Sequence, residues 1–180
     1  MSGNTESETD LDAEPFDGDH AYRKVDVDEI ADVPSPATHK KEVDEAVGAT
    51  TFGFNVYEVA PGEEVPWGYH YHPEHEELFY VLEGTLHVKT PDGEYEVGAD
   101  EAFFVPAGAP NFAYADDERV RFVAVGAPKE FDQAVIRETC PECGEATGRD
   151  YEVLEEGDEV VYVLHCAECG AEAKRFASGP

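Results

Sequence analysis

The amino-acid sequence predicts an all-β protein, an antiparallel sandwich or barrel followed by a small unit built on four cysteines. The first observation is a series of short runs rich in β-branched and aromatic residues, separated by Gly, Pro and Asp. Strands at this spacing, with turn residues between them, are typical of sandwiches and barrels. The second observation is a pair of matching cysteine spacings, Cys140-x-x-Cys143 and Cys166-x-x-Cys169.

The chain divides into three parts by composition. Residues 1–20 are polar and acidic, so we expect a disordered tail. Residues 21–130 are predicted to form the β domain, with its core at 48–127. Within it, the segment HKKEVDEAVG at 39–48 favours one short helix ending at a glycine. Residues 131–180 form the second unit, which begins with a connector at 131–139.

The charge of the chain is strongly negative throughout. It has 42 acidic and 12 basic residues, for a net charge of −30, and the three parts carry −7, −15 and −8. Such an even excess of carboxylates is typical of proteins from halophiles, where high salt screens the repulsion. Nucleic-acid binding is disfavoured, because its affinity depends on Lys and Arg neutralising phosphates.

The sequence contains no run of 18 consecutive apolar residues, which excludes a transmembrane helix of ordinary length. Its first residues have neither a basic leader nor an apolar stretch, as a secretory signal would. We therefore expect a cytoplasmic protein with no membrane partner.

The four cysteines are expected to form one metal site. Each pair stands in a tight turn that ends in glycine, so that two turns can present four thiolates tetrahedrally. Between the pairs, YEVL, the turn EEGDE and VVYVLH indicate a hairpin. The segment 140–176 resembles a zinc ribbon, which implies structural Zn²⁺ on Cys140, Cys143, Cys166 and Cys169. Two disulfides are the competing interpretation, and a cytoplasmic location disfavours them. His165 is interpreted as a strand residue.

A second candidate site lies in a histidine-rich segment, GYHYHPEHEELFYVLEG at 68–84. His70 and His72 share one face of an extended chain, and Glu77 begins the next strand after a short polar connection. Two imidazoles and one carboxylate suit a divalent metal such as Mn, Fe, Ni or Zn. Satisfied polar residues without a metal are the alternative.

This segment resembles the first motif of the cupin family, in which two histidines, a glutamate and a glycine stand at fixed spacing. His70, His72, Glu77 and Gly84 match it, whereas Glu64 stands where the motif has its first glycine, with Gly62 nearby. The stretch 98–111 resembles the second motif. There Pro106 and Gly108 match, Asp100 stands in the place of a glycine, and Asn111 in the place of the last metal-binding histidine.

The resemblance implies a cupin (jelly-roll) β-barrel followed by a small zinc-ribbon β-hairpin unit. It leaves three roles open for Asn111. The metal could be held by His70, His72 and Glu77 alone, Asn111 could be a fourth ligand through its amide oxygen, or the residues could bind a polar ligand without metal.

Other residues of this region are assigned by their position in the strands. His75 stands in the connection and is expected to be exposed, and His87 is expected in the barrel wall. Glu76, His75 and Tyr114 are weak candidates for a general base. Part of an aromatic set would line an apolar cavity suited to a small molecule; the set comprises Trp67, Tyr69, Tyr71, Phe79, Phe104, Phe112 and Tyr114.

Two functions follow as hypotheses. The first is a metal-binding cupin that acts on or binds a small organic molecule; as an enzyme it would be an isomerase, an epimerase or a dioxygenase, because the family hosts these activities. The second is a non-enzymatic sensor or scaffold whose ribbon contacts a protein partner. Apolar strands such as TFGFNVYEV need covering, so we expect a homodimer.

Overall fold

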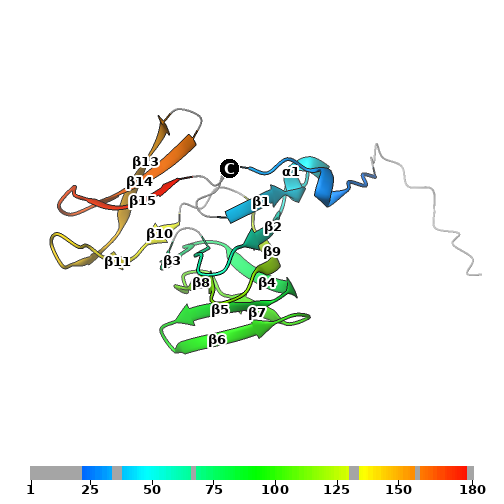
Figure 1. Ribbon diagram of the computed structural model, residues 1–180, viewed down its shortest axis with the longest axis horizontal. Coiled ribbons are helices and arrows are strands. Elements are labelled where there is room, and N and C mark those ends of the chain that lie inside the picture. The colour runs from blue at the N-terminus through cyan, green and yellow to red at the C-terminus, as the bar shows by residue number, and fades with distance from the viewer. Residues whose placement is uncertain (1–21, 34–37, 66–67, 130–133, 157–158, 178–180) are drawn as a thin grey trace, which may run out of the picture.

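The computed structural model describes residues 22–33, 38–65, 68–129, 134–156 and 159–177 (Figure 1). The expectations for the tail at 1–20 and for Trp67 lie outside the described residues. Most of the described chain is β-strand, with one 3-10 turn (η1, Val27–Glu29) and one short helix (α1, Val43–Val47). The predicted all-β class is therefore confirmed.

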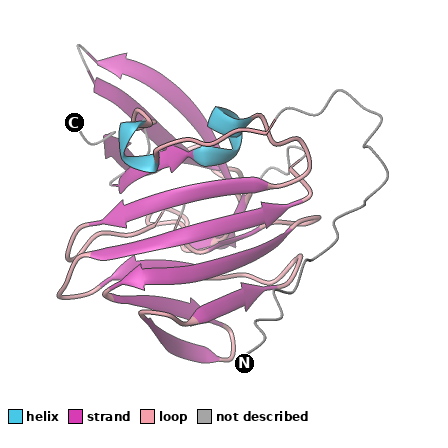
Figure 2. Ribbon diagram, turned by 90° about the vertical axis from the view of Figure 1, so that its right-hand side faces the viewer, coloured by secondary structure: helices cyan, strands magenta, loops and turns pink. Residues whose placement is uncertain are grey.

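Residues 38–129 form what we call the two-sheet domain. Its larger sheet has the order β1-β2-β9-β4-β7, and its smaller sheet has the order β6-β5-β8; all neighbours are antiparallel. Figure 2 shows the strands in layers, with the helical segments at one edge. The bounds are β1 Thr38–Glu42, β2 Gly53–Val59, β4 Glu76–Glu83, β5 Thr85–Thr90, β6 Gly93–Gly98, β7 Ala102–Val105, β8 Phe112–Ala115 and β9 Val120–Ala127.

The hydrophobic core lies between the two sheets because alternate residues of each strand point inward. Val81 and Phe122 from the larger sheet meet Leu86 and Val88 from the smaller one, and all four side chains are fully buried. The other residues of these strands face outward. On the larger sheet, this outer face exposes Leu78, Tyr80, Leu82 and Phe104. Pairing of two chains through such a face stays a prediction.

The short helix predicted at 39–48 forms over only half of that segment. Residues 38–42 are strand β1 instead, paired along its whole length with β2, while α1 ends at Gly48 as expected, with a φ of 72°. The five residues before the helix gain ladder hydrogen bonds at the edge of a large sheet. That tertiary gain outweighs a weak local helix preference.

Two glycine positions of the motifs, Asp100 and Gly84, both adopt the left-handed backbone. Asp100 adopts a φ of 67°, so it keeps the left-handed backbone for which the motif has glycine, and its carboxylate accepts a bond from the Tyr80 hydroxyl at 3.0 Å. Gly84 also has a positive φ, and a β-carbon there would collide with the Arg119 carbonyl. At Gly84 no larger residue fits.

The cysteine unit, residues 138–177, forms its own sheet. The predicted hairpin is strands β13 (Arg149–Glu156) and β14 (Glu159–Cys166), and a third strand, β15 (Glu172–Ala177), joins them. Two short strands, β11 (Glu138–Thr139) and β12 (Ala146–Thr147), bring the first cysteine turn back to this sheet.

The connector predicted at 131–139 contains structure in its described part. Strand β10 (Val135–Ile136) pairs with β3 (His70–Tyr71), which in turn bridges to Asn111 beside β8. The smaller sheet is thus extended by the first histidine strand and then by the start of the second unit. Among the described residues, no helix is long and apolar enough to cross a bilayer.

Candidate metal sites

The first site, here called the histidine site, consists of His70, His72, Glu77 and Asn111. The backbones of His70 and Asn111 exchange two hydrogen bonds, of 3.0 and 2.8 Å. The Gly108 amide donates to the His72 carbonyl at 2.7 Å. The second cupin-like motif therefore holds the two histidines of the first motif in place through the backbone.

The ring of His70 is oriented for metal binding. It is 6% exposed, and its Nδ1 lies 2.8 Å from the Gly68 carbonyl oxygen. A carbonyl can only accept, so Nδ1 carries the proton and Nε2 keeps the lone pair that a metal needs. Burial lowers the pKa of His70, which favours this neutral form.

Three ligand atoms converge at this site. Glu77 points inward from β4, on the same face as Phe79 and Val81, and its Oε1 lies 3.9 Å from Nε2 of His72. The ligand atoms of His70, His72 and Glu77 all lie within 4.8 Å of one another. Two histidines and one carboxylate at such distances can hold a divalent transition metal and leave other coordination positions open.

Asn111 supplies the observation that favours a bound group. It is 2% exposed, and neither its Oδ1 nor its Nδ2 completes a hydrogen bond within the described residues. Its amide lies beside Glu77, whose pKa it lowers. A buried amide oxygen without a partner costs about 1–3 kcal/mol, so a ligand at this position would recover that cost.

Burial raises the pKa of Glu77 to about 7, and the nearby Asn111 amide offsets only part of the rise. Without a cation, the carboxyl therefore stays protonated up to neutral pH, because the charged form is poorly solvated there. A metal needs the ionised form of Glu77. Forming that charge in the metal-free site costs free energy, because the carboxylate is buried away from water.

We predict that Glu77→Gln stabilises the metal-free protein at pH 8. In the folded chain the pKa of Glu77 is about 7, above its ordinary value of 4.5. Burial of this carboxyl therefore costs no stability below pH 4.5, and the cost grows as the pH rises from 4.5 through 7. The amide has no charge to bury, and it should raise the free energy of unfolding by about 2–3 kcal/mol at pH 8. Urea titrations at pH 8 and pH 4, under mild chelation, measure this. An equal effect at both pH values would contradict it.

The structure overturns the expectation for His75. This side chain is only 15% exposed, it stacks on His72 with ring centroids 3.8 Å apart, and its Nε2 lies 4.0 Å from Glu77 Oε1. Its ring lies beside Gly126 of β9, where a β-carbon would meet that nitrogen at 3.7 Å, an ordinary contact distance. His75 is therefore the candidate base nearest to the histidine site.

The other two base candidates lie away from the site. Glu76 is exposed on β4, and Tyr114 faces outward from β8, where its bond to Glu94 raises its pKa to about 12. His87 lies on the same outer face and stacks on Tyr114. His87 is thus in the wall of the domain, as expected, with its ring turned away from the core.

The aromatic lining is only partly as predicted. Phe79 lies in the core, but Phe104 is 52% exposed and Phe112 faces outward beside Tyr114. Sequence reasoning missed two inward residues of β2, Asn55 and Tyr57. Asn55 Oδ1 is buried without a hydrogen-bond partner in the described structure. The sequence held a signal for them: Asn55 and Tyr57 stand four and two residues before Val59, so strand alternation places all three on the inner face.

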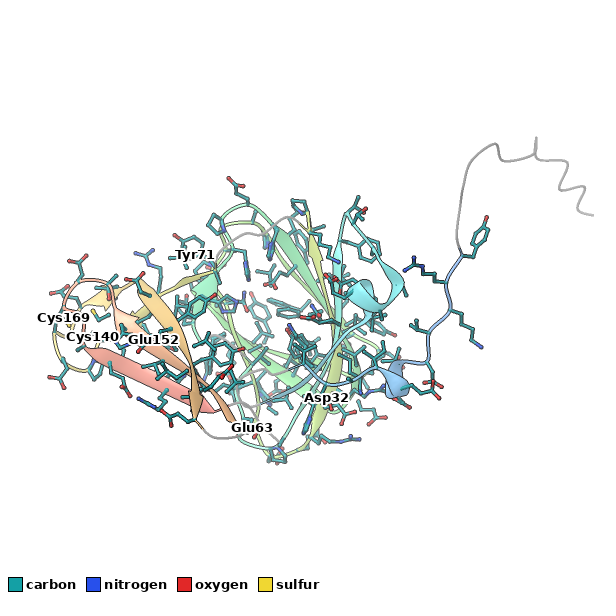
Figure 3. All side chains as sticks on the ribbon, turned by 90° about the horizontal axis from the view of Figure 1, so that it is seen from above. Asp32, Glu63, Tyr71, Cys140, Glu152 and Cys169 are labelled. Atoms are coloured by element: carbon teal, nitrogen blue, oxygen red, sulfur yellow. The ribbon has the colours of Figure 1, made fainter. Side chains whose placement is uncertain are left out.

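The second site, here called the cysteine site, joins the two cysteine turns. Sγ of Cys140 lies 3.7 Å from that of Cys169, and Sγ of Cys143 lies 3.8 Å from that of Cys166. Around one zinc ion with bonds of about 2.3 Å, tetrahedral geometry separates sulfurs by about 3.8 Å. A disulfide would need about 2.05 Å. Figure 3 shows Cys140 and Cys169 together at the far end of the unit.

The two turns are built alike. In each, the amide of the following glycine donates to the carbonyl of the first cysteine, at 2.9 Å for Gly144 and 2.8 Å for Gly170, and both glycines have positive φ. The Thr147 hydroxyl lies 3.2 Å from the Cys166 sulfur and helps to lower the pKa of that thiol to about 6. The pKa of Cys140 is lowered as well, by a backbone hydrogen bond, whereas burial and neighbouring thiols raise the pKa values of Cys143 and Cys169. Without a metal, Cys140 and Cys166 are therefore the two cysteines that favour the thiolate, the form that binds metal.

Comparison with known proteins finds a family match within the two-sheet domain. Residues 55–126 match the family model described as "Cupin domain". The tetracenomycin polyketide synthase protein TcmJ of Streptomyces glaucescens is 41% identical over 63 residues. That match covers 35% of this chain and 41% of the relative, so the chain spans less than half of that protein's length.

Among the solved structures that resemble this one are a polyketide cyclase and a sugar phosphate isomerase. The polyketide cyclase RemF from Streptomyces resistomycificus superposes with a TM-score of 0.56 at 29% identity, over 63% of this chain and 84% of that one. A sugar phosphate isomerase described as from a cupin superfamily, from Silicibacter pomeroyi, gives 0.55 at 19% identity, over 84% and 100%. The second likeness supports the fold alone.

Proposed function

We propose that this chain, in which residues 55–126 match the cupin domain, binds a divalent metal at the histidine site and acts there on a small organic molecule. The observation that carries the proposal is the convergence of His70, His72 and Glu77 beside the buried amide of Asn111, whose oxygen has no hydrogen-bond partner in the described structure. Unsatisfied buried polar groups are rare in folded proteins, and a bound water, ion or ligand is one explanation for them.

His70 and His72 would hold the metal through neutral imidazole nitrogens, and Glu77 would hold it through its carboxylate. When bound, such a metal polarises an oxygen of the substrate as a Lewis acid. His75, 4.0 Å from Glu77, would accept or donate a proton during the reaction. Asn111 and Asn55 offer buried polar atoms that would orient the substrate.

The names of the relatives support one choice of substrate class. One is named as a polyketide synthase protein and one as a polyketide cyclase, and the second aligns over most of its own length. A carbonyl-rich molecule of the polyketide type is therefore our first choice. Its several carbonyl oxygens would suit a site that combines a Lewis acid, a nearby histidine and uncharged amides.

In the cysteine unit we propose a structural Zn²⁺ ion. Four thiolates fill its coordination sphere and leave no position for a substrate. Within its described residues, the unit buries few large apolar side chains, chiefly Val161, Val163 and Leu164. Such a small core needs a metal for stability.

The alternative is a sensor or scaffold without turnover. The presence of Asn111 in place of a histidine favours it, because a neutral amide is a weaker donor for a transition metal. In that case the histidine site would bind a ligand, and the cysteine unit would contact a protein partner.

One experiment separates the two functions. The purified chain is loaded with Mn²⁺, Fe²⁺, Ni²⁺ or Zn²⁺, and each form is incubated with linear poly-β-ketone analogues and with a panel of sugar phosphates. Metal-dependent product formation that is lost in His72→Ala supports an enzyme. Saturable ligand binding with no product in any metal form would support the sensor.

A further inference from the structure

The connector before the cysteine unit pairs directly with the strand that carries His70. In the pairing of β10 with β3, Ile136 stands opposite His70 and Val135 opposite Tyr71. The ladder continues where the Arg137 amide donates to the Tyr69 carbonyl at 2.7 Å. Figure 1 shows β10 between β3 and the cysteine unit. The His70 strand therefore has Asn111 on one side and the connector on the other.

Glu138 contacts the turn that precedes His70. Its Oε1 accepts the Tyr69 amide at 3.4 Å. The same carboxylate lies against Gly68, which has a φ of 82°, and a β-carbon at Gly68 would collide with it. Only glycine permits both this backbone conformation and this approach.

The backbone that Glu138 touches is the one that orients the metal ligand. The carbonyl of Gly68 belongs to the same peptide unit as the Tyr69 amide, and this carbonyl accepts Nδ1–H of His70 at 2.8 Å. Because a peptide unit is planar, a carboxylate that fixes its N–H also fixes the direction of its C=O. Glu138 thereby sets the acceptor that keeps Nε2 of His70 turned toward the site.

Glu138 is held in turn by two other residues of the cysteine unit. Its backbone carbonyl accepts Nη2 of Arg149 at 2.6 Å, and Lys174 of β15 lies 3.8 Å from its carboxylate. Arg149 is 6% exposed, and its Nη1 donates to the Thr147 hydroxyl at 2.6 Å. That hydroxyl contacts the sulfur of Cys166. A continuous set of polar contacts thus leads from a thiolate of the cysteine site to Glu138.

We propose that Glu138 is a positioning residue for His70, and that a loaded cysteine site strengthens metal binding at the histidine site by keeping Glu138 in place. The proposal rests on the proposed metal binding at the histidine site. The part of the chain that switches between two states is the cysteine unit, which is folded with metal and unfolded without it. Coupling between two sites is reciprocal, so a metal bound at the histidine site would also strengthen zinc binding at the cysteine site.

The test uses the full chain with its cysteine site loaded with zinc. Mn²⁺ prefers oxygen and imidazole ligands to four thiolates, so its uptake reports on the histidine site. Free Mn²⁺ is read by electron paramagnetic resonance. Glu138→Ala should weaken Mn²⁺ binding at least tenfold. Glu138→Gln, which keeps an oxygen acceptor for the Tyr69 amide, should stay within about threefold of the wild type.

The matched control is Glu152→Ala. Glu152 is also a carboxylate of the cysteine unit, but its described partner is His165 on the adjacent strand, at 3.1 Å. It should leave Mn²⁺ affinity unchanged. Equal Mn²⁺ affinity for Glu138→Ala and Glu152→Ala would overturn the proposal, whereas a loss confined to Glu138→Ala supports it.

A second readout needs no bound metal at the histidine site. The Tyr69 amide faces Glu138, whereas the His70 amide bonds to Asn111 on the other side. In Glu138→Ala, hydrogen exchange should accelerate at least tenfold at Tyr69 and little at His70. If the wild type takes up no Mn²⁺, the proposed metal function fails. The exchange rate at Tyr69 still decides the positioning role, which an unchanged rate would overturn.

Discussion

Replacing Cys143 or Cys169 by serine unfolds residues 140–176 and leaves the two-sheet domain folded. Each replacement removes one of four thiolates whose sulfurs stand 3.7–3.8 Å apart in pairs. Structural zinc contributes about 10–16 kcal/mol of apparent binding free energy, which the small core of this unit cannot replace. The two-sheet domain keeps its own core between facing sheets. Zinc content and amide hydrogen exchange across 140–176 measure the result.

The control for this prediction is His165→Ala. His165 stands next to Cys166, but its ring faces Glu152 on the neighbouring strand, so zinc should be retained. Purified protein that carries two disulfides and no zinc would contradict the prediction. So would full protection of β13 and β14 in Cys143→Ser.

Alanine at His70, His72 or Glu77 removes most of the metal from the histidine site. Each of these residues supplies one of three converging ligand atoms, and two ligands hold a divalent ion poorly. Asn111→Ala should cost much less, about tenfold in affinity or below, since it removes a neutral donor. Asn111→His should tighten binding, because imidazole is the stronger donor. Metal per chain after mild chelation, measured apart from the zinc, ranks the variants.

His87→Ala is the matched control, because this histidine lies on the outer face of the smaller sheet and should leave metal content unchanged. If Asn111→Ala loses as much metal as His70→Ala, Asn111 is an essential ligand. If no variant differs from the wild type, the histidine site holds no metal, and the ligand-binding alternative without metal is favoured.

Much of this site could be predicted because its determinants are local. His70 and His72 share a face by strand alternation, and Glu77 lies five residues further on, so short-range geometry brings the three together. The cysteine turns are equally local, since each pair needs only a four-residue turn and a glycine. Residues at such short spacings take up a relative position that depends little on the rest of the fold.

Long-range contacts decided the rest. His75 is half-buried because its ring stacks on His72 and lies beside Gly126 of the neighbouring strand β9. Residues 38–42 are a strand because β2 offers an edge to pair with. Neither fact is visible in a window of ten residues, because burial and strand partners depend on parts of the chain that are distant in sequence.

The sequence by itself determined the all-β class, the two sets of candidate ligands and an acidic surface whose halophilic origin stays a prediction. Only the tertiary structure showed that the two sets are connected. Glu138 stands in a segment that looked like a plain connector, yet it reaches the turn before His70 because β10 pairs with β3. The physical reason is that periodicity tells which face a residue occupies, but the partner of a strand is chosen by the packing of the whole chain.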